Sequence, residues 1–187
     1  MKRILYRKIL KKLQRTFKKL LGKNLKGHVF RRICSLAAHI TGMIRNKSSH
    51  LSAIGKGLLQ LITAHSQTKA AKKFVYNTHV DYDTYYLPYI KEFLKLVIPI
   101  INSSDGIFFV IDGSQMGKRH AALMISLVVG KRSIPIRWFV KQGGKGHFST
   151  ENHVTLIKAV YPLLKEIINP QITITLLGDG EFDSIDL

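Results

Sequence analysis

The sequence has very little cysteine and no long apolar run. Cys34 is the only cysteine among 187 residues, which excludes an internal disulfide framework and is typical of a reducing compartment. No apolar run approaches the roughly 18 residues of a membrane span. The basic N-terminus also lacks the uninterrupted apolar segment of a secretory signal. We therefore expect a cytoplasmic protein.

Acidic residues are absent from the first 80 positions. This stretch holds 19 Lys and Arg, whereas residues 81–187 hold 11 basic and 11 acidic side chains. The net charge of +19 therefore lies in residues 1–80. Such a block attracts polyanions by releasing their counterions, whatever the base sequence. Nucleic acid is the expected partner, and an anionic membrane surface is the alternative.

The basic region also carries apolar residues at helical spacing. Residues 2–21 place apolar side chains on one face and lysines on the other, which predicts an amphipathic helix. Several short basic helices suit a DNA-binding module, although no specific recognition motif emerges. We expect an all-helical DNA-binding region over residues 1–80. Further helices are expected over about residues 29–44, from a Ser52 cap through Ile62, and over residues 69–75.

Residues 81–105 are expected to connect this region to a domain of a different kind, through a helix that starts near Pro88. From residue 106 onward the pattern changes to strand, strand, strand, helix, strand, which predicts an α/β fold. A loop is expected between the first two strands. The strands are expected over residues 107–111, 121–129, 134–140 and 172–177, and the helix begins at Ser149 or Thr150 and ends at Asn169.

An aspartate follows each of two apolar strands. Asp112 follows the first strand of this domain and Asp179 the last. Three meandering strands and a helical crossover make the fourth strand parallel to the first. If the two strands are neighbours, both carboxylates emerge at the same edge of the sheet.

Two carboxylates so close repel each other unless a cation lies between them. Oxygen ligands favour Mg²⁺ or Mn²⁺. Two such ions about 3.5–4 Å apart can activate the attacking oxygen and stabilise the leaving oxygen in phosphoryl transfer. A metal site at Asp112 and Asp179 beside a DNA-binding region indicates cutting and joining of nucleic acid.

Other interpretations of these segments are weaker. A two-residue hairpin at Asp112 is disfavoured because the next apolar strand begins near Ala121, whereas a simple turn is a stronger alternative for Asp179. The segment Gly113–Lys118 follows a strand, but it is one residue short of a phosphate loop and has Arg119 where Ser or Thr is needed. The eight histidines show no zinc spacing with the lone cysteine.

The chain resembles the DDE transposases of bacterial insertion sequences, of the insertion-sequence-four type. The segments that carry this resemblance are Phe108–Ser114 and Leu177–Asp183, with weaker matches at Ile40–Ile44, Ser49–Ser52 and Gln67–Lys72. The resemblance implies a ribonuclease H-like catalytic core, with Asp112 and Asp179 as the first two members of a metal-binding triad. It also implies binding to double-stranded transposon ends, a homodimer on DNA and a nucleoid-associated location in a bacterium.

The third member of that triad is a glutamate far downstream in the family. Glu181 is not its counterpart, because it lies only two residues after Asp179. We therefore expect residues 106–187 to be the N-terminal part of a truncated catalytic domain. The chain is then either a transposase or an inactive DNA-binding remnant able to interfere with an intact enzyme; an RNA-binding or membrane-surface protein is a third possibility. The expected DNA contacts are Arg45, Lys47, Lys69, Lys72, Lys73 and Lys118.

Overall fold

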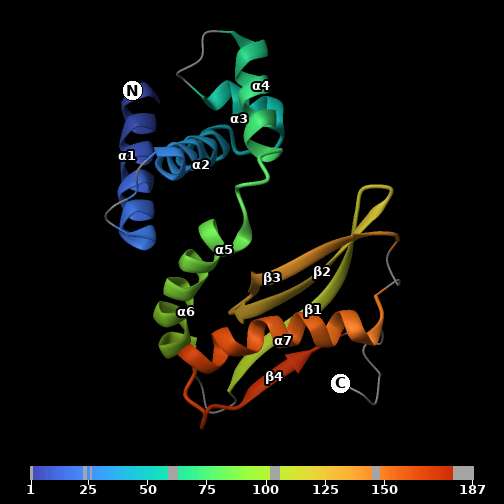
Figure 1. Ribbon diagram of the computed structural model, residues 1–187. Coiled ribbons are helices and arrows are strands. Elements are labelled where there is room, and N and C mark those ends of the chain that lie inside the picture. The colour runs from blue at the N-terminus through green and yellow to red at the C-terminus, as the bar shows by residue number, and fades with distance from the viewer. Residues whose placement is uncertain are drawn as a thin grey trace. The chain divides into compact units, whose positions relative to one another are not determined.

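The chain forms two compact units, Met1–Tyr89 and Ile90–Leu187. The first is helical and the second is a mixed α/β unit built on a four-stranded sheet (Figure 1). The computed structural model describes residues 2–22, 25, 27–58, 63–101, 106–144 and 148–178.

The helical unit follows the predicted periodicity closely. Two 20-residue helices are followed by three shorter ones. The predicted cap at Ser52 is wrong: the third helix begins at Leu51, where the extended His50 is the N-cap and its carbonyl accepts a hydrogen bond from the Ile54 N–H at 2.9 Å. The helices are α1 (Lys2–Leu21), α2 (Gly27–Asn46), α3 (Leu51–Gly57), α4 (Ala64–Val75) and α5 (Tyr82–Tyr85).

Helices α1 and α2 supply most of one apolar cluster. Ile33 and Ala37 lie one turn apart on α2 and are completely buried. Residues four positions apart lie on the same face of a helix, because a turn takes 3.6 residues. This face of α2 packs against the apolar face of α1. The buried members of the cluster are Tyr6, Leu10, Phe17, Ile33, Ala37 and Tyr85.

Glycines bring α2, α3 and α4 into backbone contact. A Cβ at Gly57 would lie 2.5 Å from the Cα of Gly42 on α2, and a Cβ at Gly55 would lie 2.8 Å from the carbonyl carbon of Gln67 on α4. Real Cβ atoms do not approach other atoms so closely. The short helix α3 is therefore wedged between its two neighbours only because these positions have no side chain.

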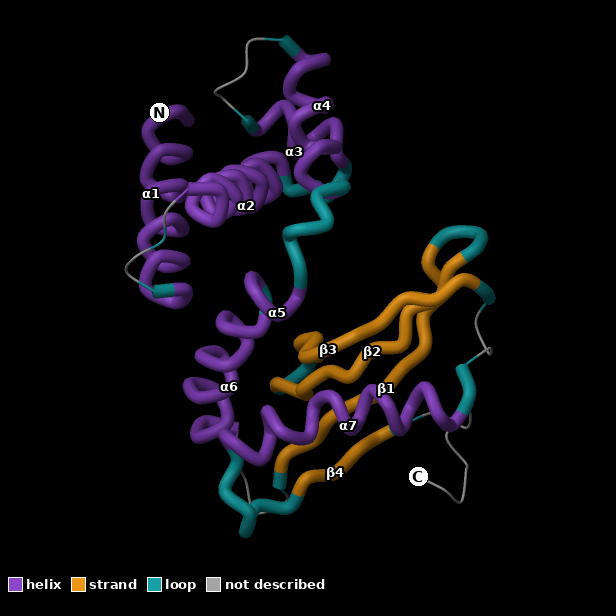
Figure 2. The backbone as a smooth tube through the Cα atoms, viewed as in Figure 1, coloured by secondary structure: helices purple, strands orange, loops and turns teal. Residues whose placement is uncertain are grey.

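The second unit contains a sheet with the strand order β3-β2-β1-β4 (Figure 2). Strand β1 pairs antiparallel with β2 and parallel with β4, while β2 pairs antiparallel with β3. The predicted parallel direction of the first and fourth strands is confirmed, and the two strands are neighbours, which was the condition of the predicted metal site. The elements are α6 (Leu87–Ile101), which starts in the helical unit, and β1 (Ile107–Met116), β2 (His120–Val129), β3 (Arg132–Gln142), α7 (Thr150–Ile167) and β4 (Ile174–Leu177).

Strand β1 is twice as long as the sequence predicts. It continues past Asp112 to Met116 and turns into β2 through residues 117–119, so the predicted loop between these strands is wrong. The register continues without a break to Met116↔His120. The prediction ended the strand with its apolar run, but exposed polar residues extend it because β2 supplies hydrogen-bonding partners for their backbone.

Helix α7 covers one face of the sheet (Figure 2). The ring of Phe139 on β3 meets that of Phe148 edge to face at 5.6 Å, and Phe148 contacts His153 on α7. Phe139 pairs with Leu123 in the sheet, so both side chains lie on the same face. The pairing of β2 with β1 puts the buried Phe109 and Ile111 on that face too. Since side chains alternate along a strand, the face that holds Asp112 is opposite α7.

Candidate functional site

Asp112 lies within β1 and is exposed. Its register partner is Met124, whose own partner on β3 is Trp138, so the three residues form a row on the face opposite α7. Ser114, two residues further on, shares this face and donates its hydroxyl hydrogen to Asp112 Oδ2 at 3.3 Å. The carboxylate therefore has water access and one polar neighbour on a rigid strand.

Asp179 lies outside the described residues. The described parallel ladder between β1 and β4 runs from Ile107↔Ile174 to Val110↔Leu177. The ladder therefore ends two residues before Asp112 on one strand, and β4 itself ends two residues before Asp179 in the sequence. The adjacency of the two strands is established, and the pairing of the two carboxylates stays a prediction.

The described residues include no group of three or more His, Cys, Asp or Glu side chains that could hold a metal ion. At β1 they provide one carboxylate and one hydroxyl, Asp112 and Ser114. Both are oxygen donors, and such donors suit Mg²⁺ or Mn²⁺ better than softer metals.

The predicted DNA contacts are distributed over both units. Arg45 and Lys47 lie at the C-terminal end of α2, and Lys47 has a positive φ of 48° where the helix ends. Lys118 lies in the turn between β1 and β2. All six predicted residues are exposed, so each can reach an anion. The remaining three, Lys69, Lys72 and Lys73, belong to α4.

Helix α4 presents a basic outer surface. His65, Lys69 and Lys72 recur at spacings of four and three residues and are exposed, whereas Ala71 between them is completely buried. Thr63 caps the helix in a reciprocal arrangement with Ser66, which fixes its N-terminus. The α4 basic face, which we define as His65, Lys69 and Lys72, therefore stands on a well-anchored helix.

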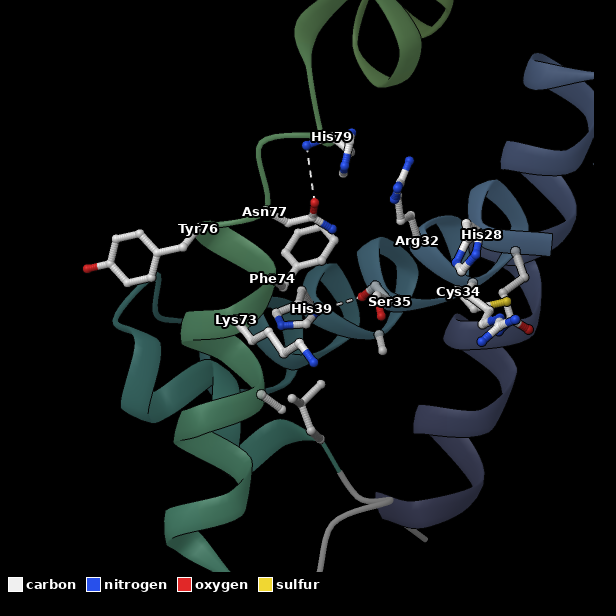
Figure 3. Close-up of a pocket in the computed structure, with 15 residues that line it drawn as sticks. His28, Arg32, Cys34, Ser35, His39, Lys73, Phe74, Tyr76, Asn77 and His79 are labelled. Atoms are coloured by element: carbon white, nitrogen blue, oxygen red, sulfur yellow. Dashed lines mark hydrogen bonds between the residues drawn. The ribbon is translucent and has the colours of Figure 1, made fainter.

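A cavity of about 810 Å³ lies beside α4 within the helical unit (Figure 3). Side chains of α2 and α4 line most of it, and the segment after α4 contributes Tyr76, Asn77 and His79. The backbone N–H of His79 donates to Asn77 Oδ1 at 3.1 Å, which orders that segment. The basic side chains of the lining are His28, Arg31, Arg32, Lys73 and His79.

His39 is a buried, neutral part of the cavity wall. Its ring stacks on Phe74 of α4, with the centroids 4.3 Å apart (Figure 3). Nδ1 lies 2.6 Å from the Ser35 carbonyl oxygen, which can only accept, so Nδ1 carries the proton and donates. Burial lowers the pKa of His39, while the carbonyls of Ser35 and Ala70 act in the opposite direction. The stack joins α2 to α4.

Sequence reasoning missed this cavity. It identified the basic residues of α4 but not Arg31 and Arg32 on α2, although two adjacent arginines in an acid-free stretch were a visible signal. The stacking of His39 on Phe74 in the cavity wall could not be predicted from the sequence, because the two residues lie 35 positions apart in the chain.

Comparison of the chain with known protein families, curated proteins and solved structures gives no match.

None of the described helices is long and apolar enough to cross a membrane.

Proposed function

We propose that this chain is part of a transposase of the DDE type, which binds transposon-end DNA through its helical unit and, when complete, cuts and joins DNA at a metal site that includes Asp112 and Asp179. In this proposal the sheet unit is a ribonuclease H-like catalytic core. The partner is double-stranded DNA, on which the protein acts as a homodimer in the bacterial nucleoid.

The parallel pairing of β1 with β4 carries the proposal. Paired positions in the described ladder differ by 67 residues, as in Ile107 and Ile174, and Asp112 and Asp179 differ by the same number. If the ladder continues in this register, the two carboxylates lie side by side. The described parallel ladder ends at Val110, so Asp112 lies just beyond it in the carboxyl direction, the side on which open parallel sheets usually bind ligands.

The carboxylates of Asp112 and Asp179 would hold the divalent ions, and the hydroxyl of Ser114 lies beside the carboxylate of Asp112. The ions, when bound, supply positive charge that polarises a phosphodiester and lowers the pKa of a bound water. The chain's own contribution is to fix one carboxylate within a paired strand, where the ladder with β2 restricts its backbone. Such restriction matters because the charge must already be in place when the transition state forms.

The charge of the helical unit supports the DNA-binding half of the proposal. The α4 basic face combines basic side chains at helical spacing with a capped helix start, which is a suitable surface for the phosphates that flank a groove. No carboxylate from residues 1–80 opposes it.

The experiment that tests this function is nicking of supercoiled plasmid DNA, with Mg²⁺ or Mn²⁺, by a full-length version of the enzyme. We expect metal-dependent nicking that falls about a hundredfold or more in Asp112→Asn and in Asp179→Asn, because an amide cannot supply the charge that positions the ions. Glu92→Gln, which removes an exposed acid on α6, is the matched control and should keep its activity.

Two results would count against catalysis. Nicking that persists unchanged in both aspartate variants would show that the residues are not ligands. DNA binding without any metal-dependent nicking by the unaltered chain would instead favour a DNA-binding protein that has no catalytic activity of its own.

A further inference from the structure

The outer face of α1 carries a row of cations that the sequence did not single out as DNA contacts. Four exposed basic side chains recur at positions i, i+3, i+4 and i+7, which share one side of a helix. Together with Thr16 they line one shallow hollow of about 370 Å³, so they gather at one place on the surface. We call these four residues the α1 basic face: Lys8, Lys11, Lys12 and Arg15.

The opposite face of α1 is apolar and already covered. Lys8 and Phe17 are nine positions apart, which is about two and a half turns of an α-helix, so their side chains point to opposite sides. Tyr6, Leu10 and Phe17 are buried in the apolar cluster that α1 shares with α2. Helix α1 therefore rests on α2 with one face and presents cations with the other.

This packing distinguishes between two polyanionic partners. A helix that lies on a membrane surface must insert its apolar face at the boundary of the acyl chains. Helix α1 could do so only by leaving α2, which would expose Ile33 and Ala37, and both are completely buried. The phosphates of a duplex need only accessible cations. The α1 basic face meets that need without rearrangement, which favours DNA over a membrane.

The arrangement of these charges is unfavourable for the helix itself. Lys8 and Lys12 are four positions apart, as are Lys11 and Arg15, and like charges at this spacing destabilise a helix. The first 80 residues contain no Asp or Glu, so no acidic side chain of α1, α2, α3 or α4 offsets the repulsion. A bound polyanion would offset it.

The length of the α1 basic face suits the spacing of phosphates. From Lys8 to Arg15 the helix rises about 10 Å, over which a duplex carries about six phosphate charges. Each of the four side chains is a permanent cation on a flexible stem, so each can reach a phosphate. The α4 basic face, in contrast, has two lysines and one histidine, His65.

We propose that the α1 basic face docks on the sugar–phosphate backbone of duplex DNA and supplies the largest electrostatic share of its binding. The proposal rests on the DNA binding proposed above and adds the surface that anchors the duplex. Contacts to phosphates carry no base sequence information directly. This anchor therefore holds DNA of any sequence.

The test measures how binding of the chain to a 20-base-pair duplex depends on salt, by fluorescence anisotropy between 50 and 200 mM NaCl. In the α1 variant, the slope of log K against log salt should become less steep by about 3.6, which is 0.9 for each of four phosphate contacts. The affinity should fall by the same factor for duplexes of unrelated sequence. The α1 variant is Lys8→Gln, Lys11→Gln, Lys12→Gln, Arg15→Gln.

A matched variant of the sheet unit controls for net charge. It removes the same number of exposed lysines and arginines and should change the slope by less than about 1. A charge-preserving variant of α1 should keep the original slope. The sheet-unit variant is Lys131→Gln, Arg132→Gln, Lys158→Gln, Lys165→Gln, and the charge-preserving variant is Lys8→Arg, Lys11→Arg, Lys12→Arg.

Two further measurements compare the helices and check folding. The double variant Lys69→Gln, Lys72→Gln of the α4 basic face should change the slope by about 1.8 at most, half the effect of the α1 variant. Glutamine forms helices about as well as lysine, so circular dichroism should show the same helix content in every variant.

Each failure has a different meaning. An unchanged slope in the α1 variant, or an equal change in the sheet-unit variant, would overturn the α1 anchor and leave DNA binding by other surfaces intact. Tighter binding to vesicles of phosphatidylcholine and phosphatidylserine than to the duplex, lost in the α1 variant, would assign this face to a membrane instead. Absence of duplex binding by the unaltered chain would overturn this proposal and the proposed function together.

Discussion

The two units of this chain are stabilised in different ways and carry different charge. Residues 1–89 hold 19 basic and two acidic residues, whereas residues 90–187 hold 11 basic and nine acidic ones. The helical unit packs short helices through glycines and a small apolar cluster. The sheet unit instead has a continuous core between β1, β2, β3 and α7. Many like charges on one unit destabilise its compact state through their mutual repulsion.

The buried polar atoms sharpen this difference. In the helical unit, the hydroxyls of Tyr6 and Tyr85 are buried without a hydrogen bond to any described residue. Burial raises the pKa of Tyr6, with Arg45 acting in the opposite direction. Such groups cost free energy, so we expect the helical unit to be the less stable of the two.

Truncation of the sheet core should have the largest effect. Phe109 is 1 % exposed and lies between Leu127 of β2 and Leu176 of β4. Phe109→Ala should lower the free energy of unfolding of the sheet unit by about 3–5 kcal/mol, measured by urea unfolding and amide hydrogen exchange. Val140→Ala, at a half-exposed position on the opposite face, should cost less than about 1 kcal/mol. An equal loss of protection in α1 and α2 would show that the two units unfold together and not independently.

A methyl group in the glycine contacts should have an intermediate effect on the helical unit. Gly57→Ala would place a Cβ 2.5 Å from the Cα of Gly42, and backbone atoms cannot move aside as a flexible side chain can. We expect a loss of about 1–3 kcal/mol, seen as faster amide exchange in α2, α3 and α4. Lys56→Ala, one position earlier and exposed, is the control. No loss in Gly57→Ala would mean that α3 is not wedged between its neighbours.

The smallest effect should be a dependence of the helical unit on pH. Burial lowers the pKa of His39 from 6.5, so the unfolded chain binds a proton at this residue at a higher pH than the folded chain does. Stability contributed by neutral His39 is therefore present above pH 6.5 and is lost as the pH falls toward the folded pKa, by about 1.4 kcal/mol for each pKa unit.

The variant His39→Phe tests whether His39 causes this pH dependence, because it keeps a ring against Phe74 and removes the titrating group. The slope of stability against pH, from urea unfolding between pH 4 and 7.5, should become flatter in this variant. His28→Gln, which removes an exposed ring, should keep the slope of the unaltered chain. An unchanged slope in His39→Phe would assign the pH dependence to other residues.

Much of the fold could be predicted from local patterns. The helix over residues 2–21 was predicted with the observed bounds. Its regular spacing of apolar residues and the glycine that follows it are both local signals. The strand order was harder, yet a meander followed by a helical crossover leaves few topologies. The parallel direction of β1 and β4 followed from that restriction, whereas their neighbourhood was a condition that only the structure could supply.

The errors arose where a contact with a distant segment decides the local structure. Ser114 and Gln115 do not resemble strand residues in isolation, and only the ladder with β2 keeps them extended. Helix α3 ends at Gly57, and positions 59–62 of the helix predicted through Ile62 lie outside the described residues. The cavity depends on the stacking of His39 on Phe74, which no spacing along the chain reveals.

The sequence alone determined the acid-free basic half, the change from helices to strands near residue 106 and the aspartates after two apolar runs. These follow from composition and periodicity, which are properties of neighbouring residues. Tertiary structure decided that Asp112 stands within a paired strand on the face opposite α7, and that α2 and α4 line most of an open cavity. Both features depend on side chains and backbones that meet only after the chain folds, because their positions are set by packing between segments far apart in the sequence.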